Sequence, residues 1–342
     1  MDTVIKTVDL HKHFGRVHAL DGLDLEVARG EVHGFLGPNG AGKSTTLRIL
    51  LGLARATSGS ATVLGRDPWS DAVDLHRHVA SIPGDVSIWP NLSGGEAIDL
   101  ISHLRGGTTD HAAYRARKKE LCETFDFDPT KKGRAYSKGN RQKVALIAAL
   151  ATDAELYLLD EPTSGLDPLM EAVFTREVRR LANAGATVLL SSHILSEVER
   201  LADRVSIIRS GRIVDGGTLD SLRHLTRTEI SFSAGAPGTA SHIDTEALAL
   251  RPEVHDLTVA DGRVKFGADS DRVHEVLPLL GTLGVKGLLV SPASLEELFL
   301  RHYGDTVDQT PSEGEKRKHD DGHHHRRHRT PEKTPANTST GA

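Results

Sequence analysis

Apolar positions along the first 225 residues fall into short runs that glycine turns and helical stretches separate. Short runs of clustered or alternating apolar residues predict β-strands, whereas apolar residues that recur every three to four positions predict helices. The predicted strands lie at 4–14, 23–27, 32–36, 61–64, 156–159 and 187–190, with a further one at 79–85 that runs into a turn. The predicted helices lie at 46–51, 70–78, 97–101 and 144–150.

The pattern changes near residue 227. Further strands are predicted at 229–232, 257–259, 263–266 and 288–290. The dipeptide Asp261-Gly262 between the middle two is typical of a tight hairpin. A helix over 273–280 contains Pro278, which must kink or shorten it, and a capped helix at 294–299 ends the pattern. Residues 226–304 are therefore predicted to form a small α+β domain of ferredoxin-like type, in which we find no catalytic constellation.

Residues 305–342 form a polar tail rich in Lys, Asp, His, Pro and Thr. Such a segment cannot bury enough apolar surface to offset the entropy of ordering, so it is predicted to be disordered. Its histidines at 323–325 and 328 offer metal ligands. Flexible histidines lack the fixed neighbours that metal sites use, however, so a solvated tail is the preferred interpretation.

Composition limits the classes of function. The net charge of −5, with both signs mixed along the chain, does not suggest a general binder of nucleic acid. Cys122 is the only cysteine, which excludes an intrachain disulfide and a cysteine-rich zinc site and fits a reducing cytosol. No segment has a signal-peptide core or the roughly 18 apolar residues of a membrane span. A membrane role would therefore require a partner.

A glycine-rich loop between the strand at 32–36 and the helix at 46–51 carries the clearest chemistry. Its residues are Gly37, Pro38, Asn39, Gly40, Ala41, Gly42, Lys43, Ser44 and Thr45. The glycines leave backbone N–H groups free to surround phosphate oxygens, and the helix start adds its own unpaired donors. Lys43 can reach the β- and γ-phosphates of a nucleotide and the Ser44 hydroxyl can ligate Mg²⁺. This pattern predicts a P-loop that binds ATP.

Two carboxylates end the buried strand at 156–159, at the edge where open α/β sheets bind ligands. Asp160 is placed to hold Mg²⁺, directly or through water. Glu161 is placed to polarise an attacking water as a general base. His193 follows the strand at 187–190 in the same sheet; a lone histidine there is usually structural, but its imidazole can contact a γ-phosphate.

Two stretches compete as a second phosphate-sensing motif. Residues 92–96, Leu-Ser-Gly-Gly-Glu, have the right letters, but a helix follows them, so we interpret Ser93 and Glu96 as a capping box. Residues 136–143 open the helix at 144–150, and Ser137 with Gly139 makes a small anion site there. Taken alone this stretch is more often a plain serine N-cap. Because the stretch lies directly before the strand that ends in Asp160 and Glu161, we prefer the anion site to the plain N-cap.

Phe14 lies at the end of the first strand, upstream of the P-loop. Aromatic residues make up only 4% of the chain, so a Phe here is a candidate for stacking on adenine. Its spacing alone favours core packing instead.

In this order and spacing, the loop at 37–45, the stretch at 136–143, the strand at 156–161, residues 164–167 and His193 closely resemble an ABC-transporter ATP-binding subunit over about residues 1–225. The resemblance implies a P-loop NTPase domain with an α/β core sheet and a helical subdomain. It makes Phe14 the adenine-stacking residue, places Asp167 near the nucleotide and makes His193 a switch residue. Ser137 and Gly139 would close on the γ-phosphate of the opposite subunit in a homodimer.

The resemblance also implies a function: hydrolysis of ATP with Mg²⁺ to power export of a small, lipid-like or drug-like substrate. The subunit would sit peripherally on the cytoplasmic face of the membrane beside a permease, with no nucleic acid. The alternatives are a soluble ABC ATPase acting on ribosomes or nucleic acid, which usually has two P-loop cores or a long insertion, and a P-loop kinase, which needs no motif like 136–143. The substrate, the permease and the roles of the C-terminal domain and tail are not encoded in these motifs.

Two departures narrow the resemblance. Gly84 followed by Asp85 stands where many relatives have a glutamine, and Tyr136, Lys138 and Asn140 replace Leu, Gly and Gln of the signature. Both resemble ABC-2-type exporter subunits similar to daunorubicin-resistance ATPases. We expect the segment 84–89 to couple to the membrane partner and Asp85 to approach Mg²⁺ through water. The sequence does not decide whether Asp85 replaces that glutamine.

Overall fold

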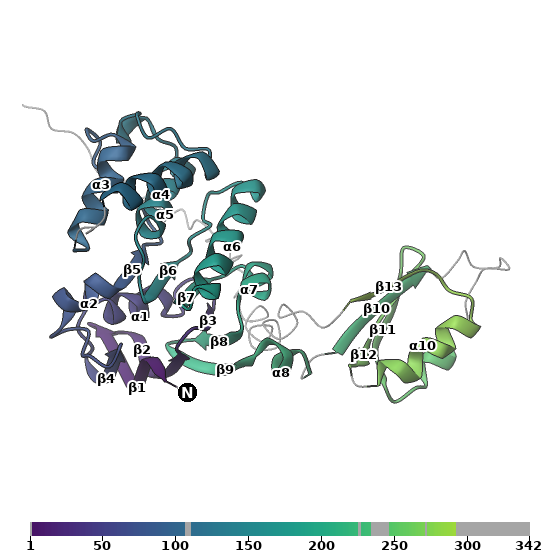
Figure 1. Ribbon diagram of the computed structural model, residues 1–342. Helices are drawn as coiled ribbons and strands as arrows, with labels where there is room; N and C mark the ends of the chain where they lie inside the picture. Colours follow the sequence, from purple (N-terminus) through teal and green to yellow (C-terminus); the bar gives the residue numbers. More distant parts are fainter. Residues whose placement is uncertain (1, 107–110, 225–226, 234–245, 271, 292–342) are drawn as a thin grey trace, which may run out of the picture. The chain divides into compact units, whose positions relative to one another are not determined.

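The computed structural model describes residues 2–106, 111–224, 227–233, 246–270 and 272–291 (Figure 1). The strands are β1 (Thr3–Phe14), β2 (Val17–Ala28), β3 (Val32–Leu36), β4 (Ser58–Val63), β5 (Val79–Ile82), β6 (Leu156–Asp160), β7 (Thr187–Ser192), β8 (Arg204–Arg209), β9 (Arg212–Thr218), β10 (Arg227–Ser233), β11 (Val254–Ala260), β12 (Arg263–Asp269) and β13 (Lys286–Ser291). The helices are α1 (Lys43–Leu50), α2 (Ala72–His78), α3 (Gly94–Leu104), α4 (His111–Thr124), the 3-10 turn η1 (Gly133–Ala135), α5 (Lys138–Leu150), α6 (Pro168–Asn183), α7 (Leu195–Leu201), α8 (Leu219–His224), α9 (Glu246–Ala249) and α10 (Val273–Thr282).

The central sheet has six strands in the order β5-β6-β7-β3-β8-β9. All its neighbouring pairs are parallel except β8 with β9. Alternate residues of one strand enter different cores: Tyr157 and Leu159 belong to one cluster, whereas Leu156 and Leu158 belong to the other. A sheet buried on both faces explains the unbroken apolar runs in the sequence. The predicted α/β core is confirmed.

Each face of this sheet has its own cover. A three-stranded antiparallel sheet, β2-β1-β4, shares a core with α1 and the residues on one face. Helices α3, α4 and α5 group together in Figure 1, and their apolar side chains belong to the core cluster of the other face. Within this group Ser93 and Glu96 form the predicted capping box at the start of α3, with Glu96 N 3.2 Å from Ser93 Oγ.

Residues 227–291 contain a separate antiparallel sheet in the order β11-β12-β10-β13, with its own apolar cluster. The succession of strand, helix, two strands, helix and strand in this order has the ferredoxin-like arrangement that the sequence predicts. At the β11–β12 turn, Asp261 and Gly262 both have positive φ, at 50° and 71°, as a tight hairpin requires.

Helix α10 contains Pro278, for which the sequence predicts a kink or a shortened helix. The helix continues past Pro278 to Thr282, so the proline does not shorten it. Val276 and Leu280 on either side are buried in the same cluster, and this packing offsets the single hydrogen bond that proline cannot make. The predicted helix at 294–299 and the tail at 305–342 lie outside the described residues, and the domain boundaries at 225 and 304 remain predictions. Among the helices that are described, none is long and apolar enough to cross a bilayer.

Candidate functional site

The predicted P-loop connects β3 to α1, and its glycines are required by geometry. Gly42 has φ 118°, a conformation that side chains rarely adopt. A Cβ at Gly37 would lie 2.5 Å from Ile208 O, so no side chain fits there. Gly42 is also the N-cap of α1 and offers no side-chain acceptor to the first turn. The helix start therefore relies on another acceptor, such as a phosphate oxygen.

Lys43 is buried at the first position of α1, with 5% of its side chain exposed. Its Nζ donates to Gly37 O at 2.6 Å and to Pro38 O at 3.1 Å, and lies 3.8 Å from Glu161 Oε1. Burial lowers the pKa of Lys43, while the carboxylates of Glu161 and Asp160 oppose that shift. The ammonium is thus held in the loop by neutral carbonyls and one nearby acid, in a place where phosphate oxygens would favour its charged form.

Strands β6 and β7 run parallel, with Asp160 opposite Ser191, and this pairing positions the two predicted acids. Ser191 Oγ donates to Asp160 Oδ1 at 2.5 Å, and Asp160 is 9% exposed. The backbone N–H of Glu161 donates to Ser191 O at 3.0 Å. Glu161 has φ 45°, a left-handed conformation that is uncommon outside glycine and asparagine. Such strain is maintained only where the surroundings determine the backbone, and it is frequent at functional sites.

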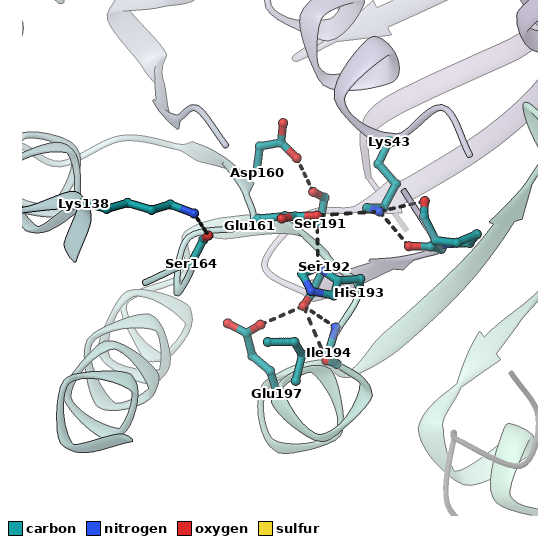
Figure 2. Close-up of polar contacts among 12 residues, drawn as sticks. Lys43, Lys138, Asp160, Glu161, Ser164, Ser191, Ser192, His193, Ile194 and Glu197 are labelled. Carbon is teal, nitrogen blue, oxygen red and sulfur yellow. Dashed lines mark hydrogen bonds and ion pairs between the residues drawn. The ribbon is translucent and has the colours of Figure 1, made fainter. Parts of the chain in front are cut away.

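His193 follows β7 and meets Glu161. Its Nδ1 lies 3.1 Å from Glu161 Oε1, the oxygen that also faces Lys43 (Figure 2). His193 keeps 47% of its side chain exposed and Glu161 25%. An imidazole that donates to a carboxylate fixes its direction and leaves the other ring nitrogen to a second partner. The structure therefore brings together the predicted catalytic pair.

A cavity of about 330 Å³ joins the predicted metal ligands. Ser44, Asp85, Asp160 and Glu161 all line it. A Cβ at Gly84 would stand 3.3 Å from Asp160 Oδ2, so the backbone at Gly84 passes close to that carboxylate. Hydroxyl and carboxylate oxygens are the donors that Mg²⁺ prefers, and their presence on one wall fits this ion. A larger cavity of about 600 Å³ beside α4 contains none of the predicted site residues.

Phe14 lies on the surface at the end of β1, with 53% of the residue exposed. The interpretation from spacing alone, that Phe14 packs in the core, is therefore wrong, because the β1–β2 hairpin projects its end into solvent. The Lys12 ammonium lies 4.8 Å from the centre of the ring. One aromatic face is thus covered by a cation, and the ring remains accessible for stacking.

Ser137 and Gly139 start α5, away from this cavity. Ser137 is exposed, and its side chain accepts from Asn140 N at 3.3 Å, so it is an N-cap, the alternative that the stretch alone favours. A Cβ at Gly139 would lie 2.5 Å from Gly165 O, so the start of α5 packs tightly on the loop after β6. Neither Ser137 nor Gly139 lines the cavity with Ser44 and Asp160.

Two polar contacts attach α5 to the loop that carries Glu161. Lys138 Nζ donates to Ser164 Oγ at 2.9 Å, and Gln142 Nε2 donates to Pro162 O at 2.8 Å. Figure 2 shows Lys138 and Lys43 on opposite sides of Glu161. The exposed start of α5 is therefore attached to the loop after Glu161, although it does not line the cavity that contains Ser44.

Asp167 and Tyr136 have structural partners. Asp167 is the N-cap of α6 and its Oδ1 accepts from the N–H groups of Leu169 and Met170, both at 3.0 Å. Tyr136, at the first position of the predicted signature, is 6% exposed, and its hydroxyl donates to Asp128 O at 2.7 Å. These contacts place Asp167 at the end of the loop after Glu161 and show that Tyr136 is a packing residue.

Ser191 was missed as a site residue. Two serines, Ser191 and Ser192, end the buried strand β7, and polar residues inside an apolar run were the available signal. Ser192 Oγ donates to Glu197 Oε2 at 2.8 Å. Burial raises the pKa of Glu197, against the effect of that hydrogen bond. Ser192 directly precedes His193, and its Oγ also accepts from Ile194 N at 2.9 Å, so these contacts support the turn that presents His193.

Comparisons with known proteins agree with this geometry. The family model described as ABC transporter matches residues 20–164. Daunorubicin resistance ATP-binding protein DrrA3 of Streptomyces coeruleorubidus is 36% identical, over 89% of this chain and 97% of its own. Bacitracin transport ATP-binding protein BcrA of Bacillus licheniformis is 32% identical, over 89% and 98%. A solved structure described as an ATP binding subunit of an ABC transporter is 31% identical, with TM-score 0.61, over 65% of this chain and 93% of its own.

Proposed function

The chain belongs to the ATP-binding subunits of ABC transporters, which bind and hydrolyse ATP, and from this premise we propose that it powers export of a small or lipid-like compound by a separate membrane permease. The observation that carries the proposal is the convergence of Lys43 and His193 on one carboxylate oxygen, Oε1 of Glu161. We propose export rather than import because the chain is similar, along nearly its whole length, to subunits named for daunorubicin resistance and bacitracin transport.

Each member of this group has a separate role in hydrolysis. Lys43 and the uncapped N–H groups at the start of α1 hold the phosphates. Glu161 accepts the proton of the attacking water, a role worth about 10²–10⁴ in rate. His193 orients that carboxylate through its 3.1 Å contact and keeps an exposed ring edge for the γ-phosphate. These groups are preorganised, so little rearrangement accompanies the transfer of charge.

The oxygen donors of Ser44, Asp160 and Asp85 are the proposed Mg²⁺ ligands, because they line one cavity beside Lys43. When bound, the ion would neutralise charge on the β- and γ-phosphates. Ser191 holds Asp160 Oδ1 through its hydroxyl. The other oxygen of Asp160 faces the backbone at Gly84, which brings the segment containing Asp85 to the same carboxylate.

We place the second half of the ATP site on another copy of the chain. Ser137 is exposed at the start of the 13-residue helix α5, where a γ-phosphate would find a hydroxyl and unpaired N–H groups. Helix α5 is attached to the loop after Glu161 by the hydrogen bond from Lys138 to Ser164. When two subunits close on ATP, a movement of α5 would therefore be transmitted to Glu161 of the same chain. This arrangement would link ATP binding to movement of a permease at the cytoplasmic face of the membrane.

Affinity purification of the tagged chain from its native membranes tests the proposal. We expect a polytopic membrane protein to copurify, and inverted vesicles that contain both proteins to accumulate substrate only with ATP. The Lys43→Ala variant is the matched control, since it should retain the permease but lose transport. Copurification with ribosomes, or with no membrane protein, would contradict the export function.

A further inference from the structure

The β1–β2 hairpin contains a group of metal-ligand side chains outside the nucleotide site. One donor atom from each of His11, His13 and Asp21 lies within 4.8 Å of the other two. The two histidines are two positions apart on β1, where side chains share a face, and Asp21 pairs with His11 across the strands. All three residues are partly buried, so their positions are restricted by the hairpin.

His13 contributes a nitrogen to this group. Its Nε2 is buried and makes no hydrogen bond within the part of the chain that the structure describes. The ring stacks on the imidazole of His18, with ring centres 3.9 Å apart and planes inclined by 17°, and this contact restricts its rotation. A buried polar atom without a partner is costly, and such atoms call for a specific explanation.

When the His11 ring is neutral, its Nδ1 and Asp21 Oδ1 face each other with lone pairs. His11 Nε2 donates to Asp9 Oδ1 at 3.0 Å, so a neutral ring presents the unprotonated Nδ1 to Asp21 Oδ1, 3.5 Å away. The other oxygen of Asp21 accepts from Arg212 at 2.7 Å, which leaves Oδ1 available. Two acceptors directed at one another are satisfied by a cation between them. A histidine whose far nitrogen donates to a carboxylate is also the usual arrangement around a protein-bound metal.

We propose that His11, His13 and Asp21 bind a transition-metal ion of the zinc class. Two imidazoles and one carboxylate suit Zn²⁺, whereas Mg²⁺ and Ca²⁺ prefer oxygen donors alone. Bond lengths of about 2.0–2.1 Å require ligand atoms about 3.3 Å apart in a tetrahedral site, so the side chains must close by about 1 Å or more. Three protein ligands leave a fourth position to water. The site contains no P-loop residue. Its ligand His13 directly precedes Phe14 on β1.

Zinc titration against a chromogenic chelator tests the site in the full-length chain. The background variant carries asparagine at His319, His323, His324, His325 and His328, so that the tail does not compete. We expect a single tight zinc site, lost in His11→Asn and in His13→Asn. Asp9→Asn should weaken it by about 10–100-fold, as the loss of a partner behind a ligand does. Asparagine tolerates the positive φ of 46° at Asp9, so this variant should keep its fold.

His78→Asn is the matched control, because His78 Nδ1 contacts Glu155 at 2.9 Å in a surface pair outside the cluster. It should bind zinc like the background. X-ray absorption of the zinc-loaded protein should report two imidazole ligands. Two results would overturn the proposal: no tight zinc site in the background, as expected if a protonated His11 already satisfies Asp9 and Asp21, or an unchanged site in both histidine variants. Retained ATP binding identifies the variants that are folded.

Discussion

Nδ1 of His193 lies 3.1 Å from Oε1 of Glu161, although 32 residues separate them along the chain. The parallel pairing of β6 with β7 creates this contact, because it brings the ends of both strands to the same edge of the sheet. The backbone N–H of Glu161 then joins Ser191 O at 3.0 Å. The orientation of the Glu161 carboxylate is thereby fixed by the backbone hydrogen bond to Ser191 and by the side-chain contact with His193.

The Glu161→Gln variant tests whether hydrolysis requires Glu161 to accept a proton or only to occupy its position. The amide keeps the size of the side chain and an oxygen for His193, but it cannot accept a proton from water. We expect the hydrolysis rate to fall by about 10²–10⁴ while ATP stays bound. The variant should then accumulate as a dimer in gel filtration with ATP and elute as a monomer with ADP. Only monomer in the presence of ATP would show that the roles proposed for Ser137 and Gly139 are wrong.

Lys43→Ala should weaken ATP binding without unfolding the protein. Hydrogen bonds to charged groups contribute about 1.5–3 kcal/mol each, so we expect affinity to fall by at least about tenfold in calorimetric titration. Burial lowers the pKa of Lys43, so burying the ammonium costs free energy that offsets its two hydrogen bonds, and the variant should stay folded. The control is Lys118→Ala, whose Nζ bonds Asp99 at 2.7 Å beyond the site and whose loss should leave ATP affinity unchanged. Equal affinities in both variants would argue against a phosphate contact at Lys43.

Local sequence chemistry was sufficient where the residues concerned are neighbours in the chain. The P-loop follows from glycine positions and a helix start, and the capping box of Ser93 and Glu96 follows from a spacing of three residues. The hairpin at Asp261-Gly262 follows from the positive φ that its turn requires. In each case the residues of one short segment determine the local structure by themselves.

Contacts that depend on strand order or register were beyond sequence reasoning. The bond from Ser191 to Asp160 requires β6 and β7 to be neighbours. The approach of His13 to Asp21 depends on a β1–β2 register that shifts at several positions. The exposure of Phe14 depends on which hairpin end remains uncovered, and apolar spacing does not encode it. The roles of Ser137, Asp85 and Mg²⁺ are still predictions.

A buried ion pair between α4 and α6 offers a test of stability. The Arg117 guanidinium donates to the Glu177 carboxylate, which is 7% exposed and also accepts from Arg180 Nε at 3.0 Å. Burial alone would raise the pKa of Glu177, but the hydrogen bonds from both arginines outweigh it and hold the pKa below its ordinary value of 4.5. Because the pKa of Glu177 is lower in the folded than in the unfolded protein, its ionised form stabilises the fold at pH values above the unfolded-state pKa. This stabilisation is lost as the pH falls through the folded-state pKa.

Arg117→Ala should therefore destabilise the protein more at neutral than at acid pH. We expect about 2 kcal/mol at pH 7, below the roughly 3–5 kcal/mol of a fully broken buried pair because Arg180 remains. Near pH 3 the difference in urea midpoint from wild type should shrink as Glu177 takes up a proton. Lys119→Ala on the same helix removes only a surface contact, since Lys119 is 79% exposed, and should have little effect at either pH. A pH-independent loss in Arg117→Ala would mean that packing, rather than charge, accounts for it.

Asp85→Asn tests whether this acid acts in place of the glutamine that the family resemblance leads us to expect at position 84. Asp85 shares a cavity wall with Ser44 and Asp160, and the backbone at Gly84 approaches Asp160 closely enough for an added Cβ to stand 3.3 Å from its Oδ2. The amide keeps the shape but loses the charge that attracts a hydrated Mg²⁺, so we expect a fall of about tenfold in ATPase rate at limiting Mg²⁺, with ATP still bound. Excess Mg²⁺ should restore part of the rate, and Asp74→Asn, a surface acid on α2 with 62% exposure, should behave like wild type. If Asp85→Asn leaves both ATPase and transport unchanged, Asp85 is an ordinary surface acid and the glycine at position 84 needs another explanation.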